Sequence, residues 1–224
     1  MGKDKNMIKG IIFDLDGTLL ESMHVWDSVA SEYLYHLGYD PDPDTDDIMK
    51  EASIQDAAAY FKARYGIKKS VEEIAYEVNA ELEDQYYHKI KPKAGVLSML
   101  AAFKEKGIRM AAATATDRYL IEPCVKRLGI YDYFSAFFTV AEVGVGKSEP
   151  LIYHQATEAL GLQKSEVAVF EDALYAAHTA KNDGYYLVGI YDDSMKNRQD
   201  ELKSFADLYV SSYESIDVVS HLTA

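Results

Sequence analysis

The stretch that decides the fold is Ile11-Ile12-Phe13-Asp14-Leu15-Asp16-Gly17-Thr18-Leu19. A mostly apolar run over residues 7–13 leads into it, and such a run predicts a buried strand. Two carboxylates, Asp14 and Asp16, follow at the end of that strand, and Gly17 allows the chain to turn just beyond them. Because ligands of open α/β sheets bind at the carboxyl ends of the strands, two acids placed there predict a site for a hard cation.

The composition limits the classes of protein that this chain can belong to. Its 224 residues carry 23 Lys and Arg against 37 Asp and Glu, which gives a formal net charge of −14. This balance argues against nucleic acids and anionic membranes as partners, because both reward clustered positive charge. Cys124 is the only cysteine, which excludes an internal disulfide and a Cys-rich metal site. With no long apolar segment and no signal-like start, we expect a cytoplasmic protein. The sequence leaves the oligomeric state open, with a monomer favoured.

The chain downstream of the first strand divides into a part with only helical patterns and a part in which strand and helix patterns alternate. Helical periodicity predicts helices over residues 21–37, 53–65 and 70–88, the last with a capping box formed by Ser70 and Glu73. Residues 40–47 are rich in Asp and Pro and predict a solvated linker. We read the 18 tyrosines of the chain as core and interface packing.

Beyond residue 91, strand and helix patterns alternate. Strands are predicted over residues 109–114, 136–140, 167–171, 185–190 and 207–210, with helices near 94–106, 118–128, 150–160, 173–182 and 195–205. Such alternation predicts an α/β fold, a Rossmann-like doubly wound parallel sheet. Because the first strand precedes the helical block, we expect a core domain of residues 1–19 plus 91–224 and an inserted, all-helical cap domain of residues 20–90.

Polar residues also follow three later strands of the predicted sheet. Thr114 ends the second strand, and Lys147 lies in the loop after the third. The fourth strand ends in the acidic pair Glu171-Asp172. Two carboxylates about 4 Å apart repel by about 1 kcal/mol in water and by about 4 kcal/mol at an effective dielectric near 20. A Mg²⁺ ion would remove that cost, and a lysine with a hydroxyl donor suits a phosphoryl group, so these residue types predict Mg²⁺-dependent phosphoryl transfer.

These motifs resemble those of the haloacid dehalogenase superfamily, and the resemblance covers nearly the whole chain. The family's first motif, Asp-x-Asp-x-Thr, is matched by residues 14–18. Its second, a Ser or Thr that closes the next strand, is matched by Thr114, with Thr116 as the second choice. Its third, a lysine commonly followed by prolines, is matched by Lys147, although Ser148 replaces one such proline. Its fourth, an acidic pair after a strand, is matched by Glu171-Asp172.

The resemblance implies catalytic roles for four residues. Asp14 would be the nucleophile that takes the phosphoryl group as an aspartyl-phosphate. Asp16 would protonate the leaving alkoxide and then deprotonate the attacking water. Lys147 and Thr114 would hold the phosphoryl oxygens. The dehalogenases of this fold do not need the acid at Asp16, so its presence favours phosphate esters over carbon–halogen bonds.

The resemblance also implies a metal site and a branch of the family. Mg²⁺ would be held by the Asp14 carboxylate, the Asp16 backbone carbonyl and Asp172, with Glu171 as a further ligand or as a partner of one. Asp172 also has the position of an N-cap for the helix that is predicted to follow it. The helical block resembles the small cap of the branch that contains phosphoglycolate phosphatase and β-phosphoglucomutase.

Three more residues are candidates for contact with the substrate: Thr116, Arg118 and His24. Arg118 follows the second strand closely and would suit an anion, whereas His24 lies where the chain enters the predicted cap. Both positions also suit ordinary helix-surface residues.

Two other ligand loops fit parts of the sequence. Residues 141–148 match a relaxed phosphate-loop pattern, but Ala141 stands where the pattern needs Gly, and a nucleotide site would leave Asp14 and Asp16 unexplained. Residues 40–51 place acids at five positions of a calcium-loop template, yet Thr45 stands where the sharp turn needs Gly. A solvated acidic linker is the preferred interpretation of that segment.

The function expected from the motifs is a Mg²⁺-dependent phosphatase that acts on a small phosphorylated metabolite. One alternative is a sugar phosphomutase of the β-phosphoglucomutase kind, in which the aspartyl-phosphate must outlast a reorientation of the substrate. A second alternative is a non-catalytic module that binds a metal ion or phosphate.

Overall fold

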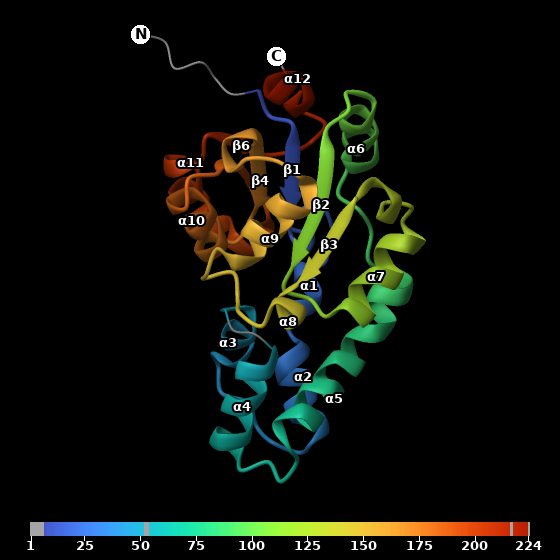
Figure 1. Cartoon of the computed structure of the whole chain (residues 1–224). Coiled ribbons are helices and arrows are strands. Elements are labelled where there is room, and N and C mark those ends of the chain that lie inside the picture. The colour runs from blue at the N-terminus through green and yellow to red at the C-terminus, as the bar shows by residue number, and fades with distance from the viewer. Residues whose placement is uncertain (1–6, 52–53, 216, 224) are drawn as a thin grey trace.

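The structure, a computed structural model, describes residues 7–51, 54–215 and 217–223. In Figure 1 a β-sheet forms one end of the molecule, and a group of helices lies beyond the carboxyl ends of its strands. The six strands are all parallel, in the order β3-β2-β1-β4-β5-β6. Their bounds are β1 Gly10–Phe13, β2 Arg109–Thr114, β3 Ala136–Thr139, β4 Val167–Glu171, β5 Tyr186–Ile190 and β6 Leu208–Val210. The prediction of a doubly wound parallel sheet is confirmed.

Strand β1 lies at the centre of the sheet, and every one of its residues is buried. It pairs with β2 on one side and β4 on the other, so the winding of the chain reverses here, which is where ligands bind in such sheets. Phe13 pairs in register with Ala112 of β2 and Phe170 of β4. The three strands therefore end at nearly the same level, and the polar residues that follow them are brought together.

Helices cover both faces of the sheet (Figure 1). Because side chains alternate along a strand, Phe13 packs on one face among Phe103 and Phe170, while Ile12 packs on the other against residues that include Ile152. The helices of the α/β part are α6 Val96–Glu105, α7 Arg118–Arg127, α8 Val140–Val143, α9 Leu151–Leu160, α10 Leu174–Asn182, α11 Gln199–Phe205 and α12 Val218–Thr223. Short 3-10 helices are η2 Tyr131–Tyr133, η3 Lys164–Glu166 and η4 Asp193–Arg198.

Between β1 and α6 the described residues form helices joined by turns and loops, with isolated β-bridges at Asp16, Leu20 and Pro92. The helices of this segment are α1 Met23–Trp26, α2 Val29–His36, α3 Thr45–Glu51, α4 Ile54–Tyr65, α5 Val71–Asp84 and the π-helix η1 Gln85–Lys89. Ser70 accepts a hydrogen bond from the backbone of Glu73, whose side chain accepts one from Ser70 in return, which confirms the predicted capping box. Residues 52–53, where the second helix was expected to begin, lie outside the described residues.

The helical segment differs from the expectation in two places. The predicted helix over residues 21–37 is broken into α1 and α2. The predicted linker over residues 40–47 is wrong over residues 45–47, because helix α3 begins at Thr45. Its Asp46 carboxylate accepts hydrogen bonds from the backbone of Ala30 and Ser31, and Asp42 pairs with Arg64. These two acids of the calcium-loop template thus have partners within the protein.

The two connections between the sheet and the helical segment run side by side. Leu20 forms an antiparallel bridge with Pro92. Around it, the backbone N–H of Glu21 donates to the carbonyl of Lys91 at 2.9 Å, and that of Lys93 donates to the carbonyl of Leu19 at 2.8 Å. The paired connections fix where the helical segment meets the carboxyl ends of the strands. Among the described residues, no helix combines the length and the apolar character needed to cross a membrane.

Candidate active site

A cavity of about 560 Å³ lies between the carboxyl ends of the strands and the helical segment. The sheet side contributes acids that include Asp14 and Glu171, together with Lys147. The helical side contributes Trp26 from α1 and Ile54 from α4. The cavity thus brings charged groups from the ends of β1 and β4 together with an apolar wall.

Lys147 connects two acids on the floor of this cavity. Its ammonium group donates to Oδ1 of Asp14, and it donates to Oε1 of Glu171 at 2.7 Å. Burial alone would lower the pKa of Lys147, but the carboxylates of Asp14 and Glu171 outweigh burial and raise it. Lys147 is therefore a fixed positive charge beside the end of β1.

Three carboxylates, those of Asp14, Glu171 and Asp172, offer oxygens that lie within 4.8 Å of one another. All three side chains are buried. Asp172 is held in place by Thr18, whose hydroxyl donates to Asp172 Oδ1 at 2.9 Å. It does not cap the next helix, since the residue before α10 is Ala173 and no side chain bonds that helix end.

The turn after β1 leaves room for Asp172. Gly17 has φ of +78°, and a Cβ atom at that position would collide with the Asp172 carboxylate. Glycine therefore permits both this backbone conformation and the close approach of Asp172.

The acidic group fits a divalent cation on two grounds. Oε2 of Glu171 is buried without a hydrogen-bond partner, although Oε1 accepts from both Lys147 and Tyr153. Burial raises the pKa of Glu171 and of Asp172, and the neighbouring acids add to both shifts, since several negative charges share one place. Carboxylate oxygens without a full set of partners are what a Mg²⁺ ion takes as ligands.

The carboxylate of Asp16 lies apart from that acidic group. Its Oδ1 accepts a hydrogen bond from Tyr86 at 2.6 Å, and its Oδ2 accepts one from Thr116 at 2.7 Å. Burial raises the pKa of Asp16 against the opposing hydrogen bond from Tyr86, and the charge of Asp14 adds to the rise. A carboxyl group whose pKa is raised in this way is suited to give and take protons.

The two candidate threonines differ in position. Thr116 lines the cavity, whereas Thr114 is fully buried and is absent from the lining. Thr114 contacts Oδ2 of Asp16 at 3.5 Å and accepts a hydrogen bond from the backbone of Thr116. The structure therefore brings both hydroxyls to Asp16 and gives only Thr116 access to the cavity.

Arg118 is not brought into the cavity. Its guanidinium group pairs with Glu142 and Glu122 and donates to the carbonyl of Phe137 at 2.8 Å. The contacts with Phe137 and Glu142 hold α7 against β3 and α8. We correct the assignment of Arg118 as a substrate contact, because its donors are engaged elsewhere.

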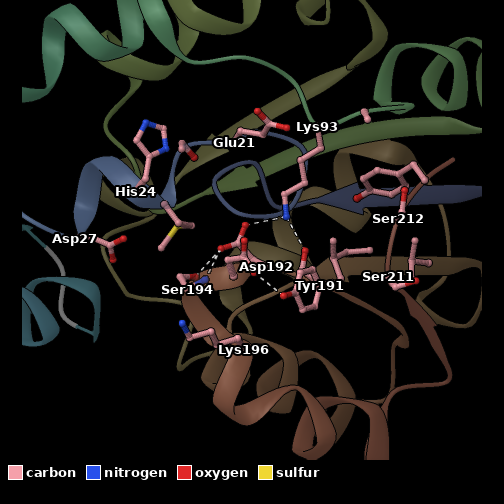
Figure 2. Close-up of a pocket in the computed structure, with 17 residues that line it drawn as sticks. Glu21, His24, Asp27, Lys93, Tyr191, Asp192, Ser194, Lys196, Ser211 and Ser212 are labelled. Carbon is pink, nitrogen blue, oxygen red and sulfur yellow. Dashed lines mark hydrogen bonds and ion pairs between the residues drawn. The ribbon is translucent and has the colours of Figure 1, made fainter. Parts of the chain in front are cut away.

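His24 lines a second cavity, of about 510 Å³, instead of the first. Figure 2 shows this second cavity, where Lys93 binds the Asp192 carboxylate at 2.9 Å and the carbonyl of Tyr191 at 2.6 Å. Asp192 also accepts a hydrogen bond from the hydroxyl of Ser194 (Figure 2). His24 therefore lies outside the lining of the main cavity.

The phosphate-loop interpretation of residues 141–148 finds no support in the geometry. Helix α8 occupies residues 140–143, and Gly144 ends it with a φ of +85°. The lysine of that pattern, Lys147, is bound to two carboxylates that the pattern leaves out.

Sequence reasoning missed three aromatic residues that contact the site. Tyr153 donates to Glu171 at 3.0 Å, Tyr86 donates to Asp16, and Trp26 donates to Tyr86 at 2.9 Å. Two of them, Tyr153 and Tyr86, were missed because the sequence analysis interpreted all tyrosines as core and interface packing residues. Their partners lie 18 and 70 residues away in the chain, so no local spacing could have identified them.

Comparison with known proteins agrees with this geometry. A family model described as haloacid dehalogenase-like hydrolase matches residues 8–182. A phosphorylated carbohydrates phosphatase of Thermotoga maritima is 26% identical over 180 residues, which is 79% of this chain and 82% of that protein. A phosphoglycolate phosphatase of Neisseria meningitidis is 27% identical over 214 residues, which is 87% of this chain and 86% of that protein.

Solved structures share the fold. CbbY of Rhodobacter sphaeroides, in complex with phosphate, superposes with a TM-score of 0.82 at 22% identity and covers 97% of this chain and 100% of that one. A β-phosphoglucomutase of Clostridium difficile gives a TM-score of 0.78 at 20% identity, with 97% of each chain covered. The resemblance to the haloacid dehalogenase superfamily, stated above from four motifs, is confirmed, and the similar proteins include a phosphoglycolate phosphatase and a β-phosphoglucomutase.

Proposed function

The chain belongs to the haloacid dehalogenase-like hydrolase family, and we propose that it is a Mg²⁺-dependent phosphatase that hydrolyses a small phosphorylated metabolite through an aspartyl-phosphate. The observation that carries the proposal is the position of Asp14. Its carboxylate touches the Lys147 ammonium, belongs to the buried acidic group, and lines the cavity. Similar proteins with phosphatase names support the same class of reaction.

Asp14, Asp172 and Glu171 would hold the ion, together with the backbone carbonyl of Asp16. The unpartnered Oε2 of Glu171 supports this role. A bound Mg²⁺ supplies positive charge that offsets the negative charge of the phosphoryl oxygens.

Side chains of the protein carry out the two steps of phosphoryl transfer. A carboxylate oxygen of Asp14 attacks phosphorus, the bond to the leaving oxygen breaks, and that oxygen takes the proton of Asp16. In the second step a water molecule gives a proton to Asp16 and attacks phosphorus, and the bond to Asp14 breaks. Lys147 would bind the phosphoryl oxygens, as would a hydroxyl of the Thr114 and Thr116 pair.

We propose that residues 20–90 act as a cap domain on a core of residues 1–19 and 91–224. Cap helices α1 and α4 line the cavity, and the paired connections at Leu20 and Pro92 are where a closing motion would be centred. Closure would exclude bulk water from the aspartyl-phosphate and would select the leaving group.

The test is phosphate release from p-nitrophenyl phosphate, followed by a panel of sugar phosphates, polyol phosphates, nucleotides and phosphoglycolate. We expect turnover with Mg²⁺, and none after EDTA or in Asp14→Asn. Turnover by Asp14→Asn would contradict the role of nucleophile. Conversion of β-glucose 1-phosphate into an isomeric sugar phosphate would indicate a mutase, and a folded, metal-binding protein that is inactive on the whole panel would indicate a binding module.

A further inference from the structure

The hydroxyl of Tyr86 connects the proposed acid of the site with the cap. Tyr86 lies in the π-helix η1 and is fully buried. Its hydroxyl donates to Oδ1 of Asp16 at 2.6 Å and accepts from Nε1 of Trp26, in α1, at 2.9 Å. A single phenol thus joins Asp16 to both ends of the helical segment, where the chain enters it and where it leaves.

The direction of these hydrogen bonds follows from the chemistry of the three groups. An indole N–H can only donate, so Trp26 occupies an acceptor site of the phenol oxygen. Tyr86 has one hydroxyl proton, and the carboxylate oxygen 2.6 Å from its hydroxyl is Oδ1 of Asp16. That proton therefore points at Oδ1 of Asp16. The hydroxyl of the cavity-lining Thr116, which donates to Oδ2, can instead rotate and accept, so a proton carried by Asp16 itself belongs on Oδ2.

The backbone around Tyr86 is held from the core. Arg127 of α7 donates to the carbonyl of Tyr86, within the π-helix, at 3.1 Å and to the carbonyl of Ile90, directly after it, at 2.8 Å. Single-turn π-helices are uncommon and occur often at functional sites. Here the wider turn, pinned by Arg127, places the Tyr86 side chain against Asp16.

We propose that Tyr86, oriented by Trp26, is a positioning residue that fixes the carboxyl group of Asp16 so that Oδ2 carries the catalytic proton. This inference rests on the proposed function. When Asp14 attacks phosphorus and the bond to the leaving oxygen breaks, the O–H bond at Oδ2 breaks and the proton passes to the leaving oxygen. Without Tyr86 the carboxyl group is free to rotate, and the proton is no longer held toward the cavity.

The test uses leaving groups of one size that differ in their need for a proton. p-Nitrophenolate departs readily as an anion, whereas phenolate benefits from a proton. Both phosphates give the same aspartyl-phosphate, and kcat/KM covers only the steps up to its formation. We expect Tyr86→Phe to lower kcat/KM for phenyl phosphate on the order of tenfold and that for p-nitrophenyl phosphate by less than about twofold. Trp26→Phe should give a smaller loss with the same preference.

The neighbouring tyrosine provides the matched control. Tyr87 lies in the same π-helix, but its hydroxyl donates to the carbonyl of Tyr119 at the surface. Tyr87→Phe should leave both substrates unaffected, and competitive inhibition by inorganic phosphate should be the same in all variants, because Asp14 and Lys147 are untouched. An equal loss on both substrates, or no loss on either, would overturn the proposal. If the wild-type protein hydrolyses neither aryl ester nor any member of the phosphate-ester panel, the proposed function fails, and there is then no catalytic proton for Tyr86 to position.

Discussion

Lys147 and Glu171 form an ion pair of 2.7 Å in which both side chains are almost completely buried, at 2% and 1% exposure. Oε1 of Glu171 takes this contact, while Oε2 remains without a partner. The lysine also touches Asp14, so one cation serves two acids. The pair therefore leaves one carboxylate oxygen of Glu171 that, with the nearby Asp172, would serve as a ligand of the proposed metal ion.

The first prediction concerns this ion pair. Lys147→Met should reduce the free energy of unfolding by about 3–5 kcal/mol with EDTA present, because two buried acids lose their cation. Since burial raises the pKa of Glu171, protonation relieves the charge as the pH falls, and the loss should be larger at alkaline than at acidic pH. Urea denaturation measures it. Lys164→Met, which breaks a partly exposed pair with Asp183, should cost about 0–1 kcal/mol; similar losses for both variants would contradict the buried-pair argument.

The second prediction concerns the metal ion. Mg²⁺ at about 100 times its dissociation constant should stabilise the folded protein by about 2.7 kcal/mol, which thermal unfolding detects as a higher midpoint. Asp172→Asn should remove most of this shift, since the amide is a poorer ligand, while Thr18 can still donate to its oxygen. Asp183→Asn, at a surface site, should keep the shift. A full Mg²⁺ response in Asp172→Asn would exclude Asp172 as a ligand.

The third prediction uses two glycines in the same backbone conformation. Gly17 and Gly38 have φ of +78° and +82°, but a Cβ at Gly38 meets nothing within 4 Å, whereas one at Gly17 meets Asp172. Gly38→Ala should cost about 1 kcal/mol of stability from backbone strain alone. Gly17→Ala should cost more, and it should also weaken Mg²⁺ binding by displacing Asp172. If both variants lose the same free energy of unfolding and Gly17→Ala binds Mg²⁺ as tightly as the wild type, the turn at residue 17 can accommodate a Cβ atom, and the prediction is wrong.

The fourth prediction separates the two threonines. Thr116→Val removes a cavity-lining hydroxyl and a 2.7 Å hydrogen bond to Asp16, so kcat/KM should fall on the order of tenfold. Thr114→Val removes a contact of 3.5 Å outside the cavity lining, and the loss should stay within about threefold. Steady-state kinetics with p-nitrophenyl phosphate compares them. The reverse ranking would return the phosphoryl contact to Thr114, as the family motif implies.

Features that depend on neighbours in the chain were predictable. The apolar run before Asp14 became β1, and the strands over residues 109–114 and 167–171 have the bounds that were expected. Ser70 and Glu73 form their capping box because the two residues lie three apart on one helix turn.

Other features depended on contacts between distant segments. Helix α3 begins inside an acidic, proline-rich stretch because Asp46 finds donors at the start of α2. Arg118 has the charge and the chain position expected of a substrate contact, yet its guanidinium group forms an ion pair with Glu142, 24 residues away.

The sequence by itself determined that two acids, a lysine and an acidic pair would follow the strands of one parallel sheet, because the periodicity of side chains and the chemistry of strand ends are local properties. Only the tertiary structure decided which of those groups share a cavity, and that Asp16 is bonded to Tyr86 across 70 residues. The physical reason is that a hydrogen bond depends on the positions of two atoms in space, which packing fixes after the local elements have formed.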